Sequence, residues 1–159
     1  MRAVILGLML LAAGAAQAAA QEGVSYFAGK WDVASKDPAS GETLAMTYVV
    51  EPTLGGAWLA GAGAAVDGSY SARDMWGRDP LTGELIRVIF SDGAFGTVRS
   101  KGWAGERLVL EGETRSAGGT VRVRETITRI SPQKFEAVWA AYRNGQWVDY
   151  AVETVTRRS

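Results

Sequence analysis

Residues 120–157 read TVRVRETITRISPQKFEAVWAAYRNGQWVDYAVETVTR, and this stretch decides the fold class. It contains three runs rich in Val, Ile, Thr and aromatic residues, at 120–131, 134–142 and 146–157. Only turn residues separate these runs. Asn144-Gly145 is the strongest hairpin signal among them, because both residues accept a positive φ. The stretch therefore predicts three antiparallel β-strands joined by tight turns.

The rest of the chain continues this rhythm of short runs broken by Gly, Pro, Asn or Asp. Seven further runs of the same composition are expected as strands, at 30–35, 43–51, 57–66, 69–76, 85–90, 96–101 and 107–114. A short helical turn is expected at 22–29, and no connection is long enough for a crossover helix. Closing such a sheet removes its open edges. The sequence predicts an all-β fold, a single antiparallel up-and-down β-barrel of about ten strands.

The N-terminus has the layout of a secretory signal peptide. A basic start is followed by an apolar run at 3–13 and then by small residues. This pattern predicts an export signal over residues 1–20, cleaved after Ala18 or Ala20. The alternative is a retained membrane anchor, but a transmembrane helix needs about 20 apolar residues and this run is shorter. We expect residues 21–159 to form a barrel domain in the periplasm or outside the cell, with no membrane span.

The composition excludes several kinds of chemistry. The chain has no Cys and no His, which excludes disulfides, thiol nucleophiles, a lipid-modified Cys and sites that depend on His. Seventeen basic residues balance seventeen acidic ones, so there is no electrostatic footprint for nucleic acid. The Gly-rich stretch at 55–63 lacks the Lys and the helix of a phosphate loop. We expect no metal, no cofactor and no nucleic-acid partner.

Alternation within the predicted strands places two carboxylates on largely apolar faces. Glu125 shares its face with Val121, Val123 and Ile127. Asp74 lies on the same face of its predicted run as Tyr70, Ala72 and Trp76, because these residues are two positions apart. A carboxylate inside a barrel needs a cation to keep its charge, and Arg87 or Arg99 on nearby strands could supply one. Glu125 would then anchor a ligand head group or act as a general acid, and with Asp74 it could do acid–base work. The alternative for Glu125 is a strand phase wrong by one residue, which would turn it to solvent. The alternative for Asp74 is a structural ion pair with an Arg.

Three other runs have less simple patterns. In the run at 85–90, one face carries Ile86, Val88 and Phe90, and Arg87 is opposite. In the run at 146–157, Asp149 and Glu153 lie on the face opposite Val148, Tyr150 and Val152. The run at 134–142 is apolar on both faces. That pattern is typical of contact with something outside the barrel, or of tolerated apolar surface.

Trp residues form the second set of candidate binding residues. Four of the six Trp residues could line an apolar ligand cavity: Trp58, Trp76, Trp103 and Trp139. Ligand pockets are mostly apolar with a few placed polar groups, which agrees with this reading. The alternative role for these side chains is packing in the core and at the ends of the barrel.

The run Phe27-Ala28-Gly29-Lys30-Trp31 opens the first predicted strand. Its Gly-x-Trp resembles the opening signature of lipocalins and of the wider calycin group of β-barrels. The resemblance implies structural roles for Gly29, Trp31 and Arg157. Trp31 would close the bottom of the barrel beside a cation of the last strand, for which Arg157 is the match. A guanidinium over an indole is worth about 0.5–2 kcal/mol.

More of the chain is similar to a bacterial calycin-like family, domain of unknown function 1579. The matching stretches are Phe27-x-Gly29-x-Trp31, 79–83, 108–113, 121–128, 131–135 and 154–157. Together they run from residue 27 to residue 157. The family carries no agreed activity, so the resemblance implies a calycin-like barrel and transfers no catalytic residue.

These observations lead to three functional hypotheses. A barrel of eight to ten strands is filled by its own side chains or holds one small ligand. The leading hypothesis is a non-enzymatic binder of a small, largely apolar molecule. The alternatives are an envelope scaffold with a filled barrel, and an enzyme that uses carboxylate, Arg and Tyr side chains in the interior. The sequence identifies no catalytic residue and sets no oligomeric state.

Overall fold

A computed structural model describes residues 23–159, and ten of its eleven strands lie where the sequence predicts them. The strands are β1 (Gly29–Lys36), β2 (Thr43–Thr53), β3 (Trp58–Ala65), β4 (Ser71–Arg78), β5 (Leu85–Ser91), β6 (Ala94–Ser100), β7 (Trp103–Ala104), β8 (Arg107–Ser116), β9 (Gly119–Ser131), β10 (Lys134–Arg143) and β11 (Gln146–Arg157). Two short 3-10 turns accompany them, η1 (Ser25–Phe27) and η2 (Leu54–Gly56). The predicted signal segment, residues 1–20, lies outside the described residues.

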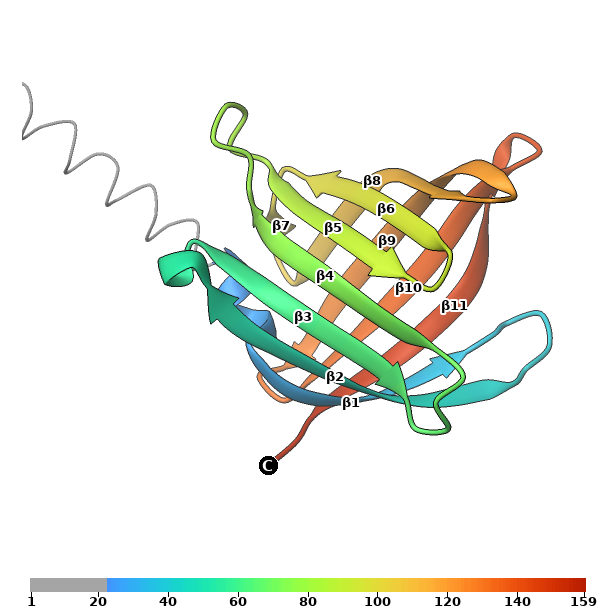
Figure 1. Cartoon of the computed structure of the whole chain (residues 1–159), viewed down its shortest axis with the longest axis horizontal. Coiled ribbons are helices and arrows are strands. Elements are labelled where there is room, and N and C mark those ends of the chain that lie inside the picture. The colour runs from blue at the N-terminus through green and yellow to red at the C-terminus, as the bar shows by residue number, and fades with distance from the viewer. Residues whose placement is uncertain (1–22) are drawn as a thin grey trace, which may run out of the picture.

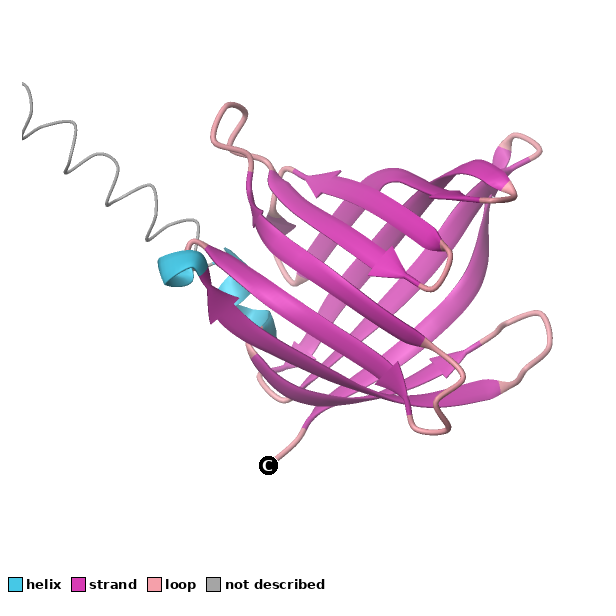
Figure 2. Cartoon of the chain, in the orientation of Figure 1, coloured by secondary structure: helices cyan, strands magenta, loops and turns pink. Residues whose placement is uncertain are grey.

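The strands form one closed antiparallel barrel (Figure 1). Consecutive strands pair from β1 to β6 and from β8 to β11, β1 pairs with β11, and β6 pairs with β8 to complete the ring. The two-residue strand β7 lies outside the ring on β8 and was not predicted. The predicted fold class is thus confirmed, and Figure 2 shows strands in nearly all of the described chain. Within residues 23–159, no helix is long and apolar enough to cross a membrane.

A β-bulge interrupts the pairing of β10 with β11. The register between β10 and β11 shifts after Trp139, so that Ala140 pairs with Asp149 and Tyr150 is left as an extra residue. The extra residue is on β11, so β10 keeps its alternation: Phe135, Trp139 and Ala141 line the cavity, whereas Ala140 is buried on the other face. The run at 134–142 is thus apolar on both faces of one regular strand. The next connection is the tight turn that the sequence predicts, because Asn144 and the following glycine have φ values of 50° and 84°.

One end of the barrel is sealed where the chain enters it. Trp31 is fully buried, and its indole N–H donates a hydrogen bond to the carbonyl of Phe27 at 2.8 Å. The Arg157 guanidinium lies 4.0 Å from the Trp31 ring centroid and donates hydrogen bonds to the carbonyls of Tyr26 and Ala28. This is the pairing that the Gly-x-Trp resemblance implies. Gly29 is needed beside it, because a Cβ there would lie 2.3 Å from Arg157 Nη1.

An aromatic cluster completes the seal. The Phe27 ring stacks on Trp76 at 4.7 Å between centroids and on Trp103 at 5.8 Å. Phe135 meets Phe27 edge-on at 5.5 Å. Because hairpin loops alternate between the two ends, the loops after β1, β3, β5, β8 and β10 all gather at the other end (Figure 1). The barrel therefore has one end closed by aromatic packing and one end rimmed by hairpins.

Candidate functional site

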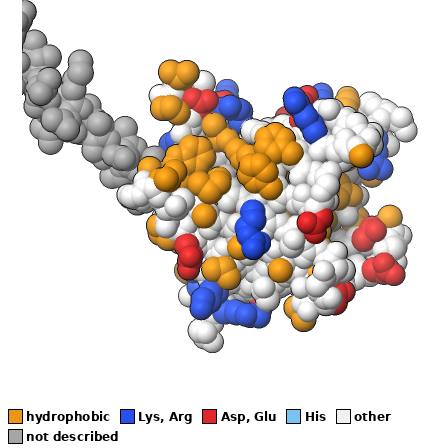
Figure 3. All heavy atoms as spheres, in the orientation of Figure 1, with side chains coloured by type: hydrophobic (Ala, Val, Ile, Leu, Met, Phe, Trp, Pro, Cys, Tyr) orange, Lys and Arg blue, Asp and Glu red, His pale blue; other side chains and the backbone are white. Residues whose placement is uncertain are grey.

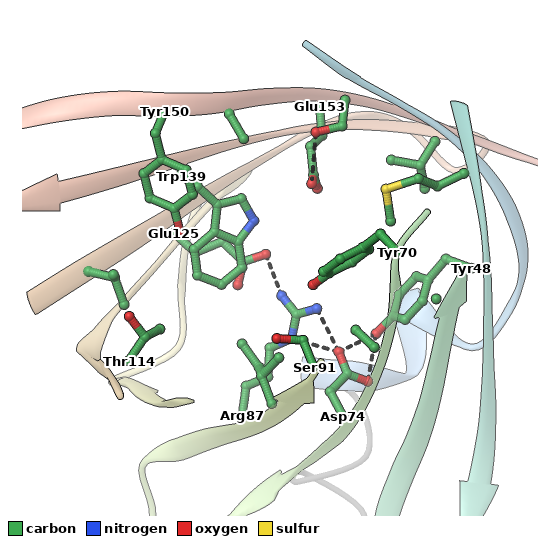
Figure 4. Close-up of a pocket in the computed structure, with 18 of the residues that line it drawn as sticks. Tyr48, Tyr70, Asp74, Arg87, Ser91, Thr114, Glu125, Trp139, Tyr150 and Glu153 are labelled. Atoms are coloured by element: carbon green, nitrogen blue, oxygen red, sulfur yellow. Dashed lines mark hydrogen bonds and ion pairs between the residues drawn. The ribbon is translucent and has the colours of Figure 1, made fainter. Parts of the chain in front are cut away.

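A cavity of about 510 Å³ occupies the barrel between the aromatic seal and the hairpin rim. This volume falls in the range of small-molecule sites, which is about 300–1,000 Å³. Its apolar wall includes Val33, Leu44, Met46, Ile89, Val121 and Val123. The barrel is thus not filled by its own side chains, and a polar cluster lies on the inner wall (Figure 4).

Arg87 of β5 is the centre of this polar cluster. Its Nε and Nη2 atoms donate to Asp74 Oδ2 of β4 at 2.8 and 2.6 Å, and its Nη1 donates to Glu125 Oε1 of β9 at 2.5 Å. Its guanidinium carbon lies 4.4 Å from the Trp76 ring centroid and 5.5 Å from that of Trp139. Burial acts to lower the pKa of Arg87, but its two carboxylate neighbours raise it well above the ordinary value. Arg87 is therefore a permanent cation, already paired with two acids.

Tyr48 of β2 extends the cluster along the sheet. Its hydroxyl donates to the Asp74 carboxylate, with Oδ2 at 2.7 Å, and accepts a hydrogen bond from the Trp76 indole at 3.0 Å. Burial raises the pKa of Tyr48 well above its usual value, so it stays protonated. A Cβ at Gly61 would lie 1.8 Å from Asp74 Oδ1 and 2.6 Å from the Tyr48 oxygen. The glycine on β3 thus makes the space in which this network sits.

Glu125 is buried, with 2% of its surface exposed, and its two carboxylate oxygens differ in their hydrogen bonding. Oε1 accepts from Arg87, whereas no described residue bonds to Oε2. Burial raises the pKa of Glu125, and the opposing pull of Arg87 offsets only part of this effect. Buried polar atoms in native proteins are almost always hydrogen-bonded, so an orphaned oxygen on a cavity wall requires explanation.

Glu153 of β11 is a second acid on the cavity wall. Its Oε1 accepts a long hydrogen bond, 3.5 Å, from the hydroxyl of Ser35. Burial and the nearby Glu125 raise the pKa of Glu153 to about 7. Burial also raises the pKa values of Tyr70 and Tyr150, which line the same cavity (Figure 4). The cavity thus holds neutral phenols and an acid that titrates near neutral pH.

The structure brings five of the eight predicted binding residues together. Those on the cavity wall are Asp74, Trp76, Arg87, Glu125 and Trp139. The predicted inward phases of Glu125 and Asp74 are correct. On β5, however, Arg87 faces inward with Ile89 and Ser91, so the face with Ile86, Val88 and Phe90 is the outer one.

The other three predicted residues lie outside the cavity lining. Arg99 faces outward with 44% of its side chain exposed and pairs with Asp79 at 2.8 Å, because β6 turns Val98 and Ser100 inward. The cation expected beside Glu125 is thus Arg87 and not Arg99. Trp58 covers Gly77, where a Cβ would lie 2.3 Å from its ring.

Trp103 belongs to the sealed end of the barrel. Its indole N–H donates to the carbonyl of Gly23 at 2.6 Å. The Arg129 guanidinium carbon lies 3.5 Å from its ring centroid. Trp103 is a packing residue, which is the alternative that the sequence left open.

The polar residues of the wall that were not selected from the sequence include Tyr48, Tyr70, Tyr150 and Glu153. Tyr70 is four residues from Asp74, so strand alternation places both on the inward face. Tyr48 is two residues from Met46 and faces inward with it. For Tyr150 and Glu153 no sequence signal was sufficient. The bulge at Tyr150 breaks the two-residue period on which the reading of 146–157 depended.

Comparison with known proteins identifies the fold only. No family model matches the chain, and no curated protein matches it. Among solved structures, Rv2717c from M. tuberculosis superposes with a TM-score of 0.61 at 15% identity, covering 87% of this chain and 97% of that chain. A redesigned β-barrel, b11L5F_LGL, matches with a TM-score of 0.44 at 17% identity, over 86% and 96% of the two chains. Another, mFAP1 bound to DFHBI, has a TM-score of 0.43 at 15% identity, over 85% and 98%.

Proposed function

We propose that this protein is a non-enzymatic binder of a small, largely apolar molecule, which it holds inside the barrel. The observation that carries the proposal is the cavity of about 510 Å³ between a sealed end and a hairpin rim. Its apolar wall would bury the body of the ligand. The Asp74, Arg87 and Glu125 cluster would fix one polar group and so set the orientation of the ligand.

Small residues on the inner wall support this proposal. Gly63, Ala72, Ala94 and Ala151 line the cavity at positions where larger aliphatic side chains would fill it. An unfilled apolar cavity lowers the stability of a protein, in proportion to its volume. A ligand that occupies the space restores these contacts and stabilises the folded state.

The test uses decanol as a neutral apolar probe and isothermal titration calorimetry of the full chain. We expect saturable binding of one molecule per barrel. Gly63→Leu would fill part of the cavity and should abolish binding, since a Cβ at Gly63 has ordinary contacts, the nearest at 3.7 Å. Ala64→Leu, on the exposed face of the same strand, is the matched control and should bind like the native protein. Absence of binding, or equal binding by both variants, would refute a site in the barrel.

A scaffold function is the second candidate, and an exposed aromatic pair on the outer wall favours it. Phe90 and Phe95 are 48% and 41% exposed, and their ring centroids are 5.4 Å apart. Figure 3 shows apolar side chains gathered on the face that carries β4 and β5. Exposed apolar patches mark interaction surfaces. Sedimentation velocity of Phe90→Ser against the native chain tests this idea, because a scaffold that self-associates through this face should dissociate.

We also propose that the chain is exported and that residues 1–20 are removed, as the N-terminal pattern predicts. Mass measurement of the protein from a fractionated host tests this proposal. An intact N-terminus on cytoplasmic protein would refute it. Membership of the domain of unknown function 1579 family stays a prediction that rests on the stretches quoted above.

A further inference from the structure

We propose that the ligand carries a protonated amine on its apolar body, and that this ammonium group lies between Glu125 and Glu153. The inference rests on the proposed function and names the chemical class of its ligand. It starts from the charges on the cavity wall. Three carboxyl groups, those of Asp74, Glu125 and Glu153, face the cavity, and among the described arginines that line it only Arg87 is withdrawn from solvent.

Arg87 is not available to an anionic ligand. Its Nε, Nη1 and Nη2 atoms all donate to Asp74 or Glu125, and its plane lies beside the Trp76 ring. A ligand carboxylate at this point would add a third negative charge beside one guanidinium, and a buried charge without its own partner is costly. The cavity therefore disfavours the acidic head group that a free arginine would bind.

The free acceptors point to a donor on the ligand. Glu125 Oε2 is buried without a hydrogen-bond partner, and Glu153 has only the distant hydroxyl of Ser35 among the described residues. Figure 4 places both carboxyl groups beside the same open space. An ammonium group has three N–H donors and one positive charge, so it could donate hydrogen bonds to both carboxyl groups and balance their charge.

Aromatic rings around this space would support the cation further. Trp139 and Tyr150 lie beside Glu125, with ring centroids 6.4 Å apart, and Tyr70 reaches into the same space (Figure 4). The negative face of an aromatic ring attracts a cation, and more strongly when the cation is desolvated. Two other arginines border the cavity, Arg73 and Arg143, but both are exposed to solvent and do not neutralise the buried acids.

Three probes with the same ten-carbon chain test the head group directly: decylammonium, decanol and decanoate. Each is titrated into the full chain at about pH 8, below its micelle concentration, and followed by calorimetry. We expect decylammonium to bind about tenfold more tightly than decanol, and decanoate to bind most weakly. If decanol binds as tightly as decylammonium, or decanoate binds best, the amine proposal fails and the binding function stands. If none of the three binds, both proposals fail.

Substitution of Glu153 shows whether the preference arises inside the cavity. Glu153→Gln should lower the affinity for decylammonium about tenfold and leave that for decanol unchanged. Glu136→Gln removes an exposed acid of β10 outside the cavity lining and should change neither affinity. Equal losses in the two variants would indicate general attraction of the cation to the protein surface and would overturn the proposed site.

Discussion

Arg87 and Glu125 form an ion pair across the interior of the barrel, with Nη1 2.5 Å from Oε1. Their strands, β5 and β9, are not neighbours, because β6 and β8 separate them in the sheet. Arg87 also holds Asp74 on the adjacent strand β4, with Nη2 2.6 Å from Oδ2. One guanidinium thus links opposite parts of the wall and supplies the positive charge that two buried acids require.

Replacement of this cation should destabilise the fold strongly. We expect Arg87→Leu to lower the free energy of unfolding at pH 7 by about 3–5 kcal/mol, because Asp74 and Glu125 would stay buried without a partner. The deficit should shrink in acid, because burial raises the pKa of Glu125 and this carboxyl group then becomes neutral. Urea unfolding at several pH values measures it. Arg99→Leu is the control, since its exposed ion pair should contribute less than about 1 kcal/mol.

Two glycines of β3 provide a matched test of the network. Gly61→Ala would place a Cβ 1.8 Å from Asp74 Oδ1, whereas Gly63→Ala meets its nearest neighbour at 3.7 Å. We expect Gly61→Ala to lower the free energy of unfolding by about 1–3 kcal/mol and Gly63→Ala to be close to neutral. Thermal unfolding of both variants measures the difference. Equal stability would show that the space beside Asp74 is not required.

The sealed end offers a second matched pair, at consecutive positions. Arg157→Leu removes the cation over Trp31 and three hydrogen bonds to backbone carbonyls, so we expect a loss of about 2–4 kcal/mol. Arg158→Leu removes an ion pair with Asp32 from a side chain that is 48% exposed, and should cost less than about 1 kcal/mol. Chemical denaturation distinguishes these outcomes. Similar losses would argue against the role of Arg157 in closing the barrel.

The stability of the protein should fall as pH rises through the titration of Glu153. Its pKa is about 7 in the folded protein and near 4.5 in the unfolded chain. Between these values the folded state holds the proton more firmly, so the free energy of unfolding decreases with rising pH. Glu153→Gln should match the native protein at about pH 4, below the pKa of the unfolded chain, and exceed it by about 1–3 kcal/mol at about pH 8.

The groups that set this titration face Glu153 from several strands: Ser35, Tyr70, Arg87, Glu125 and Tyr150. Glu136→Gln on the outer wall leaves all of them in place and is the control. Denaturant unfolding at the two pH values gives both differences. A Glu153→Gln variant less stable than the native protein at about pH 8 would contradict the direction of the shift.

Most of the fold could be predicted from local patterns. Short β-rich runs and the Asn144-Gly145 turn located the ten ring strands, and the parity of Glu125 placed it inside the barrel. The pairing of Trp31 with Arg157 followed from the Gly-x-Trp resemblance. Each of these features depends on residues close in sequence or on a pattern shared by many barrels.

The rest of the site depends on contacts that no local pattern contains. Whether Arg87 or Arg99 pairs with Glu125 depends on which residues of β5 and β6 face inward. Local pattern does not settle this on β5, because apolar residues also occupy its outer face. Glu153 and Tyr150 were missed because a single bulge changes which residues of β11 face inward. The orphaned oxygen of Glu125 becomes visible only when all of its neighbours are placed.

The most direct test of the central claim is to ask whether the barrel is occupied in its own host. The protein is purified from that host without detergent, its native mass is measured, and bound molecules are extracted with organic solvent and identified. The account predicts one small, largely apolar molecule per barrel, absent from the Gly63→Leu variant and present in Ala64→Leu. A native protein that is empty, and stays empty after exposure to a lipid extract of the host, would contradict it.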